Sequence, residues 1–234
     1  GIGSEIAVAL GEYGAHVIAR SRGEGGCDET LDRIRAVGGE GEAKVCHIGK
    51  MEQIEGIYQY IDKTHGKLDI LVNNAASNPY YGHILDTDLG SFKKTLEVNL
   101  QGYFFMSVYA GRRMREAKAG AILNVASING VSPGDKQGVY SMTKAGIINM
   151  TKAFARECGS LGIRVNSLIP GLTRTRFAQA LHDDDDFMAM QIPNTPLARG
   201  GEPSEMAAAA LYLLSDAASY TTGASIVVDG GYLA

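Results

Sequence analysis

The sequence has few cysteines, and their arrangement fits neither a disulfide framework nor a zinc site. Cys27, Cys46 and Cys158 are odd in number, far apart, and form no C-x-x-C motif. The five histidines form no H-E-x-x-H motif, and we interpret the acidic run at 182–186 as a solvated loop. We therefore expect no metal site, and a protein that works in the reducing cytoplasm.

The sequence also lacks a long apolar run and an excess of basic residues. No stretch approaches the ~20 apolar residues that span a bilayer, and no basic and apolar leader opens the sequence. The net charge is −4 with a pI of about 5.8, and the basic residues are scattered. Because this charge favours neither nucleic acid nor an anionic membrane surface, we expect small-molecule partners.

Apolar segments typical of strands alternate with amphipathic segments typical of helices. Between residues 51 and 66, four apolar side chains recur at the spacing of one helix face: Ile54, Ile57, Tyr58 and Ile61. The strand-like segments are continuous apolar runs, as expected for parallel strands covered on both faces. With no repeat or linker in 234 residues, this pattern predicts one domain over 1–234 with an α/β, doubly wound parallel sheet. The expected strands are 16–21, 43–48, 68–74, 121–127, 163–169 and 225–229.

The first residues begin inside a glycine-rich turn. Gly1 and Gly3 lead into a helical pattern, but no strand-like segment feeds this turn. In a doubly wound sheet the first strand lies at the centre, and its loss would leave unpaired backbone groups in a dry interior. We therefore expect a first central strand upstream of the printed sequence.

The segment YSMTK, at 140–144, contains two candidate catalytic pairs. Tyr140 and Lys144 form Y-x-x-x-K, whereas Ser141 and Lys144 form S-x-x-K, the nucleophile motif of penicillin-binding enzymes. Spacing does not decide between them, because both pairs share a helix face. The S-x-x-K enzymes also need S-D-N and K-T-G, and neither string occurs here. This favours the Tyr/Lys pair and leaves Ser141 as a helix-surface or packing residue.

Further motifs extend over the whole chain. They are the glycine-rich turn at 1–3, NNAA at 73–76, VNL at 98–100, Ser127, YSMTK at 140–144, PGLTRT at 170–175 and TTGASIVVDGG at 221–231. In this order and spacing they resemble the short-chain dehydrogenase/reductase family, and AHVIARSR, VCHIGK and NNAASNP look most similar to its broad-substrate, NADPH-dependent carbonyl and retinal reductases. The resemblance implies a Rossmann-type fold, hydride transfer between NAD(P)(H) and a ketone or secondary alcohol, and a homotetramer.

The resemblance implies a catalytic set of Asn99, Ser127, Tyr140 and Lys144. A free phenol has a pKa near ~10, so we expect the Lys144 ammonium to lower the pKa of Tyr140 toward neutrality. Ser127 ends a strand-like run, at the edge where such sheets bind ligands, and would donate to the substrate oxygen. Asn99 matches the asparagine that holds a water in the family's proton relay.

The resemblance also assigns the dinucleotide site. Backbone N–H groups of Ile2 and Gly3, at a helix start, would bind the pyrophosphate. Ile6 stands where the general G-x-G-x-x-G motif has its third glycine, whereas the family's turn T-G-x-x-x-G-x-G would end at Gly3. The sequence departs from the family pattern at Ala76, which replaces a glycine, and at His47, which replaces an aspartate. The remaining expected contacts are His47, Ile48, Asn74, Ala75, Ala76, Tyr140, Lys144, Pro170, Gly171, Thr173 and Thr175.

The strand end at Ser21 and Arg22 bears on the choice of coenzyme. NAD-selective folds carry a carboxylate about 20 residues after the glycine turn, which binds the ribose and repels a 2′-phosphate, whereas a nearby arginine accommodates that phosphate. Ser21 stands where the carboxylate would be, and Arg22 follows it. We therefore predict that NADP(H) is preferred, with NAD(H) as the alternative.

The sequence does not identify the substrate. Related 3-oxoacyl thioester reductases and sugar or steroid dehydrogenases share most of these motifs, and a dinucleotide-binding sensor without catalysis is a non-enzyme alternative. We expect residues 78–81, 132–134 and 177–195, the last forming the family's mobile lid, to border the substrate. The apolar segment at 102–111 is expected to contribute to the tetramer.

Overall fold

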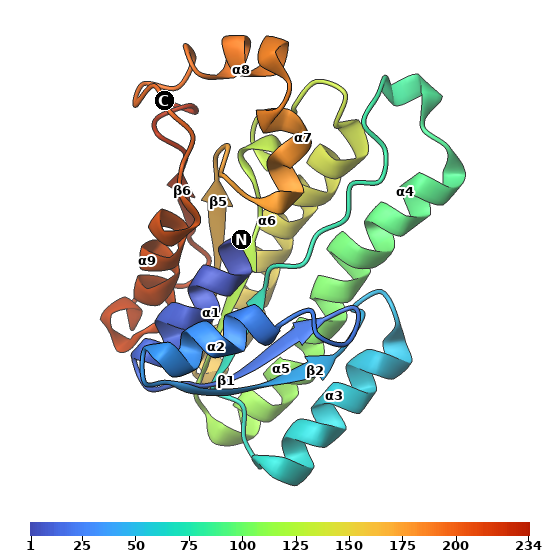
Figure 1. The fold of residues 1–234 in the computed structure, drawn as a ribbon. Helices are drawn as coiled ribbons and strands as arrows, with labels where there is room; N and C mark the ends of the chain where they lie inside the picture. Colours follow the sequence, from blue (N-terminus) through green and yellow to red (C-terminus); the bar gives the residue numbers. More distant parts are fainter.

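The computed structural model describes residues 1–234, which form parallel strands between two layers of helices (Figure 1). β1 (His16–Ser21) pairs with β2 (Glu40–Val45). The other four strands form a second sheet in the order β3 (Ile70–Asn73), β4 (Gly120–Val125), β5 (Ile163–Pro170) and β6 (Ser225–Val228). All pairings are parallel, and no ladder joins β1 to β3. The expected α/β class with a parallel sheet is confirmed.

One helix layer consists of α1 (Ile2–Glu12), α2 (Asp28–Ala36) and α9 (Pro203–Leu214), which lie in front of the strands in Figure 1. Ile6 of α1 and Met206 of α9 pack with Leu123 and Leu168 of the sheet. The second layer consists of α3 (Met51–Thr64), α5 (Tyr103–Ala117) and α6 (Gly138–Cys158). The sheet is therefore covered on both faces, which explains why β4 and β5 are almost wholly buried apolar runs.

The helical periodicity predicted for residues 51–66 is confirmed in α3. Ile54, Ile57, Tyr58 and Ile61 are all buried, and they belong to the core between the sheet and the second helix layer. In α6, buried positions recur at the same three- and four-residue spacing, at Tyr140, Lys144, Ile147 and Thr151. This spacing turns the YSMTK segment inward rather than to solvent.

The strand predicted at 43–48 is wrong at both ends, since β2 runs from Glu40 to Val45. β2 lies at the edge of its sheet, and half of its residues are exposed, so it does not read as a continuous apolar run. Cys46 still donates its N–H to Ser21 O at 2.9 Å, after which the chain turns towards α3. The other predicted strands match within two residues.

The acidic run at 182–186 is not a loop as expected, because it joins two short helices, α7 (Gln179–His182) and α8 (Asp185–Gln191). Asp184 caps α8 by accepting a hydrogen bond from Phe187 N at 2.9 Å. Acidic side chains stabilise a helix start, and Asp185 and Asp186 occupy the first turn.

None of the helices is both long enough and apolar enough to cross a bilayer.

α4 (Leu89–Leu96) continues through a π-helical segment, Glu97–Gly102, into α5. The arrowheads of β5 and β6 point towards α7 and α8, so the carboxyl edge of the sheet faces these helices (Figure 1).

Candidate active site

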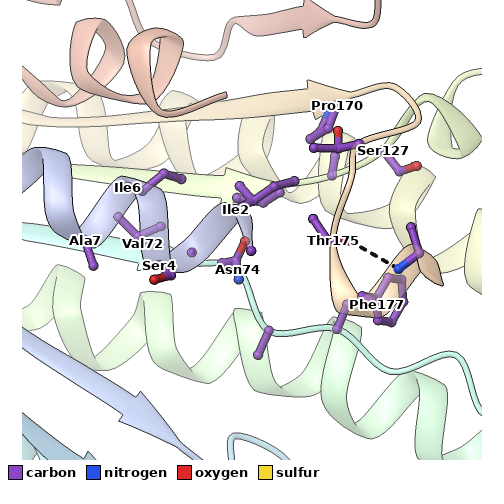
Figure 2. Close-up of a pocket in the computed structure, with 18 of the residues that line it drawn as sticks. Ile2, Ser4, Ile6, Ala7, Val72, Asn74, Ser127, Pro170, Thr175 and Phe177 are labelled. Carbon is purple, nitrogen blue, oxygen red and sulfur yellow. Dashed lines mark hydrogen bonds between the residues drawn. The ribbon is translucent and has the colours of Figure 1, made fainter. Parts of the chain in front are cut away.

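A cavity opens at the carboxyl ends of β3, β4 and β5 and continues into the gap between β1 and β3, where no ladder joins the two strands; the volume of about 1370 Å³ includes this gap. Figure 2 shows Ile2, Asn74, Ser127, Pro170 and Thr175 arranged around it. Most of the residues predicted from the sequence line this one cavity. They are Ile2, Gly3, Asn74, Ala75, Ala76, Ser127, Tyr140, Lys144, Pro170, Gly171, Thr173 and Thr175.

The start of α1 forms one wall of the cavity. No side chain caps this helix, and its first N–H groups have no partner within the helix. Gly3 lies against the side chain of Asn74: a Cβ atom at Gly3 would come within 2.5 Å of Asn74 Nδ2. Any larger residue at position 3 would have to displace the Asn74 side chain, and the glycine leaves backbone donors facing the cavity.

Ser127, Tyr140 and Lys144 meet on the opposite wall. Ser127 follows β4, and its Oγ accepts a hydrogen bond from Asn129 N at 3.2 Å, which begins a short turn. Tyr140 and Lys144 are both buried on the inner face of α6. Lys144 Nζ donates to Val125 O at 2.8 Å and lies 5.4 Å from the centre of the Tyr140 ring.

Burial controls the ionisation of this pair. Burial raises the pKa of Tyr140 to about 12, and a hydrogen bond with Ser127 opposes that shift only in part. Burial also lowers the pKa of Lys144 to about 7. The expectation that Lys144 brings the phenol pKa toward neutrality is wrong for these residues as they stand, because desolvation favours the uncharged form of both groups. At neutral pH the Tyr140 phenol holds its proton.

Asn99 lies in the π-helical segment and does not line the cavity. Its Oδ1 accepts from Ser77 N at 2.8 Å, and its Nδ2 donates to Ser77 O and to Thr143 Oγ1, both at 3.0 Å. Both Nδ2 hydrogens are thus used. The Asn99 side chain therefore connects Ser77, in the segment after β3, with Thr143 of α6, the residue before Lys144.

Four predicted coenzyme contacts lie outside the cavity lining: Ser21, Arg22, His47 and Ile48. The Ser21 hydroxyl donates to Gly23 O, and Arg22 is exposed at the surface. The Ile48 side chain is buried in the core, so only its backbone can meet a ligand. His47 Nδ1 accepts from Gly49 N at 3.0 Å, and this bond holds the turn after β2.

Two further residues, which were not predicted from the sequence, position the site. Thr143 Oγ1 donates to Tyr140 O at 2.7 Å and accepts from Asn99, although it lies inside the YSMTK motif. Tyr103 donates to Val125 O at 3.3 Å, the same carbonyl that Lys144 binds. Its only sequence signal is its position in the apolar segment 102–111.

Ser141 is a packing residue and not a surface residue, since it is buried and its Oγ accepts from Gly134 N at 3.3 Å. This bond holds the loop 132–134, which lines the cavity as expected. Of the expected segment 78–81, only Tyr81 lines it. From 177–195, the Phe177 ring lies 6.0 Å from the Tyr140 ring, and Met190 adds further apolar surface.

Comparison with known proteins gives the same picture as the geometry. A family model described as enoyl-(acyl carrier protein) reductase matches residues 1–233. Dehydrogenase/reductase SDR family member 4 of Oryctolagus cuniculus is 36% identical over 231 residues, which cover 99% of this chain and 89% of that protein. Tropinone reductase-like 3 of Erythroxylum coca is 34% identical over 231 residues, which cover 99% of this chain and 88% of that protein.

Solved structures agree with this relationship. A short-chain alcohol dehydrogenase from Sinorhizobium meliloti 1021, so described, superposes with a TM-score of 0.95 at 36% identity, covering 100% of this chain and 92% of that one. A protein described as an NAD(P)-dependent gluconate 5-dehydrogenase from Beutenbergia cavernae, with bound NADP, gives 0.94 at 33% identity over the same shares. The chain therefore belongs to the short-chain dehydrogenase/reductase family, whose members are NAD(P)-dependent oxidoreductases acting on alcohol and carbonyl groups.

Proposed function

We propose that this protein is a carbonyl reductase or alcohol dehydrogenase that transfers a hydride between NADP(H) and a ketone or secondary alcohol. The observation that carries the proposal is the convergence of Ser127, Tyr140 and Lys144 on the cavity that also receives the start of α1. A proton donor and a nucleotide-binding helix end thus face the same space, as hydride transfer to a carbonyl requires.

The dinucleotide, when bound, supplies or accepts the hydride. In reduction, Tyr140 donates its phenolic proton to the substrate oxygen while the carbonyl carbon gains the hydride. Ser127 donates a hydrogen bond to the same oxygen as negative charge grows on it. Lys144, fully buried beside the ring, stabilises the phenolate that remains once the proton has left. In oxidation the same groups act in reverse, and Tyr140 takes the proton from the alcohol.

The residues around α1 fit a dinucleotide. The uncapped N–H groups at Ile2 and Gly3 suit a pyrophosphate, and the close contact of Gly3 with Asn74 leaves no side chain in their way. Thr173 and Thr175 line the same cavity from the segment after β5. We infer that these groups hold the coenzyme.

The preference for NADP(H) rests on charge. No carboxylate follows β1 at Ser21, and the exposed Arg22 forms no ion pair, so its guanidinium is available for a 2′-phosphate. The Beutenbergia cavernae structure described above contains NADP, as does a 2-deoxy-D-gluconate 3-dehydrogenase, so described, from Agrobacterium tumefaciens. Both observations support the choice of coenzyme.

A second candidate is a sugar-acid dehydrogenase, favoured by the gluconate dehydrogenases among the similar structures. Against it, the Phe177 ring lies 6.0 Å from the Tyr140 ring, and Met190 and Tyr81 add apolar surface to a lining that also contains Asp135, Lys136 and Gln137. We therefore favour an apolar ketone over a polyhydroxy acid.

A substrate panel tests the proposal. Aliphatic and aromatic ketones, 3-oxoacyl thioesters, steroids and sugar acids are assayed with NADPH and NADH by coenzyme absorbance. We expect the highest kcat/KM with an apolar ketone and NADPH. Turnover of sugar acids alone would favour the second candidate. Tight coenzyme binding with no turnover on any substrate would contradict both and favour a sensor.

A further inference from the structure

A cluster of two histidines and one glutamate lies at the amino edge of the sheet, where His16 and His65 line the part of the cavity between β1 and β3. His16 is the first residue of β1, Glu42 lies in β2, and His65 follows α3. Glu42 Oε1 is 2.8 Å from His65 Nε2 and 3.7 Å from His16 Nε2. The two imidazole rings lie 5.0 Å apart, so two nitrogen atoms face one carboxylate oxygen.

The other oxygen of Glu42 is already held. Oε2 accepts from the Tyr60 hydroxyl at 2.6 Å and lies 3.2 Å from Lys44 Nζ. These two contacts fix the orientation of the carboxylate, with Oε1 turned towards His65 Nε2 and His16 Nε2.

A second carboxylate lies near His16. Its Nδ1 is 3.8 Å from Oε2 of the exposed Glu40, while its Nε2 faces Glu42. A carboxylate on one ring nitrogen of a histidine favours a lone pair on the other, an arrangement found around metal-bound histidines. The side chains of His16, Glu42 and His65 are 42%, 25% and 26% exposed, and His16 and His65 line the space between β1 and β3.

We propose that His16 Nε2, His65 Nε2 and Glu42 Oε1 form a Zn²⁺ site, with water as the fourth ligand. Zinc takes imidazole nitrogen and carboxylate oxygen at about 2.0–2.2 Å, which places tetrahedral ligand atoms about 3.3 Å apart. The distances of 2.8 and 3.7 Å from Glu42 Oε1 bracket that value, and all three candidate ligand atoms lie within 4.8 Å of one another. Mixed imidazole and carboxylate ligands favour zinc over magnesium or calcium.

Such an ion would connect three elements that are distant in the sequence. β1, β2 and the end of α3 each supply one ligand, so binding stabilises this end of the molecule relative to the unfolded chain. The proposal revises the expectation of no metal site, which rested on the absence of local sequence motifs. It does not depend on the proposed activity.

Zinc binding is tested on chelator-treated protein by calorimetric titration with ZnCl₂ at pH 7.5. We expect one Zn²⁺ per chain, and at least tenfold weaker binding in both His16→Gln and His65→Gln. His83→Gln is the matched control, because His83 is an exposed histidine outside the cluster, and it should bind zinc like the unmodified protein. Co²⁺ in place of Zn²⁺ should give the visible absorption of a tetrahedral site, which the two cluster variants lose.

Two results would overturn the proposal. One is the absence of zinc binding by the unmodified protein, which would leave an ionic cluster without metal. The other is binding that His16→Gln leaves unchanged, or that His83→Gln weakens equally, which would place the ion elsewhere. Circular dichroism checks that each variant folds. If His65→Gln does not fold, the more exposed His16→Gln decides the outcome.

Discussion

At the level of single residues, the proposed chemistry depends on a buried phenol that keeps its proton at neutral pH. With the pKa of Tyr140 raised to about 12, the phenol is ready to act as the acid in ketone reduction, but the phenolate needed for alcohol oxidation is scarce. Below that pKa the phenolate fraction increases about tenfold for each pH unit. The rates of oxidation and of reduction should therefore depend on pH in different ways.

We expect kcat for alcohol oxidation to increase between pH 7 and pH 9, while kcat for ketone reduction does not increase. The loss of charge on Lys144 above its pKa of about 7 opposes the increase in oxidation, so the gain stays below the tenfold limit per unit. Initial rates in both directions at saturating coenzyme test this. An oxidation rate that is flat or decreases over the range would contradict the ionisation of Tyr140 described here.

The choice of coenzyme is also decided by single residues. Arg22→Ala should weaken NADPH binding by about 1.5–3 kcal/mol, the loss of one charge-assisted hydrogen-bonded pair, with little effect on NADH. Ser21→Asp should shift the preference towards NADH, since a carboxylate repels the 2′-phosphate. Arg35→Ala, which removes an exposed arginine paired with Asp32, is the control and should change neither affinity. Equal kcat/KM with both coenzymes in the unmodified protein would contradict the preference.

At the level of elements, the active site requires that the turn after β4 lies directly against α6. Gly130 makes this contact possible: a Cβ atom there would come within 2.7 Å of the Lys144 carbonyl carbon. Backbone atoms of a helix cannot move aside as a flexible side chain can. The turn that begins at Ser127 and the helix that carries Lys144 are therefore positioned by one glycine.

Gly130→Ala should lower the free energy of unfolding by about 1–3 kcal/mol through overpacking, and should lower kcat as Ser127 and Lys144 move apart. Gly56→Ala, in an exposed part of α3 where a Cβ meets nothing within 4 Å, is the matched control and should stabilise the protein by up to about 1 kcal/mol. Urea unfolding and initial rates measure both effects. A Gly130→Ala protein as stable and active as the control would exclude the close contact.

Elements with a complete buried face were predictable, and elements at the boundary with solvent were not. α3 matches its prediction because the buried residues Ile54, Ile57 and Tyr58 recur at the spacing of one helix face. The bounds predicted for the strand at 43–48 differ from those of β2, because an edge strand does not need a continuous apolar run. The break between α7 and α8 was missed because Asp184 was interpreted as solvated, although it acts as a helix cap.

At the level of the whole molecule, the apolar surface of the second helix layer supports the expected homotetramer. Phe104 of α5 is 43% exposed, and its ring makes T-shaped contacts with the rings of Phe105 and Phe154 at 5.3 and 5.5 Å. A cluster of aromatic rings on a helix surface is typical of an interface between chains.

We predict that light scattering at micromolar concentration gives four times the mass of one chain. Phe104→Glu should reduce the mass to that of smaller species, because it places a charge in the interface. The control Leu85→Glu alters a side chain that is 84% exposed and lies away from this cluster, and should leave the tetramer intact. A monomer in the unmodified protein would exclude the tetramer.

The sequence was sufficient to place most of the site but not its ionisation. Motifs such as YSMTK and PGLTRT predicted which segments meet, because the carboxyl ends of parallel strands share one edge of a sheet. The pKa of Tyr140 depends on how completely α6, the turn after β4 and Phe177 exclude water, and no local pattern records that. The cluster of His16, Glu42 and His65 could not be predicted from the sequence either, because its members come from three separate elements and form no local pattern.

The central claim is that Tyr140 is the proton donor, and Tyr140→Phe tests it most directly. The substitution removes only the hydroxyl oxygen, so coenzyme affinity and folding should be kept while kcat decreases by about 100-fold or more. Tyr220→Phe, which removes a hydroxyl from a fully exposed tyrosine, is the control and should keep full turnover. The account predicts loss of turnover in Tyr140→Phe alone, with coenzyme binding unchanged. Turnover within a few-fold of the unmodified protein in that variant would contradict the account.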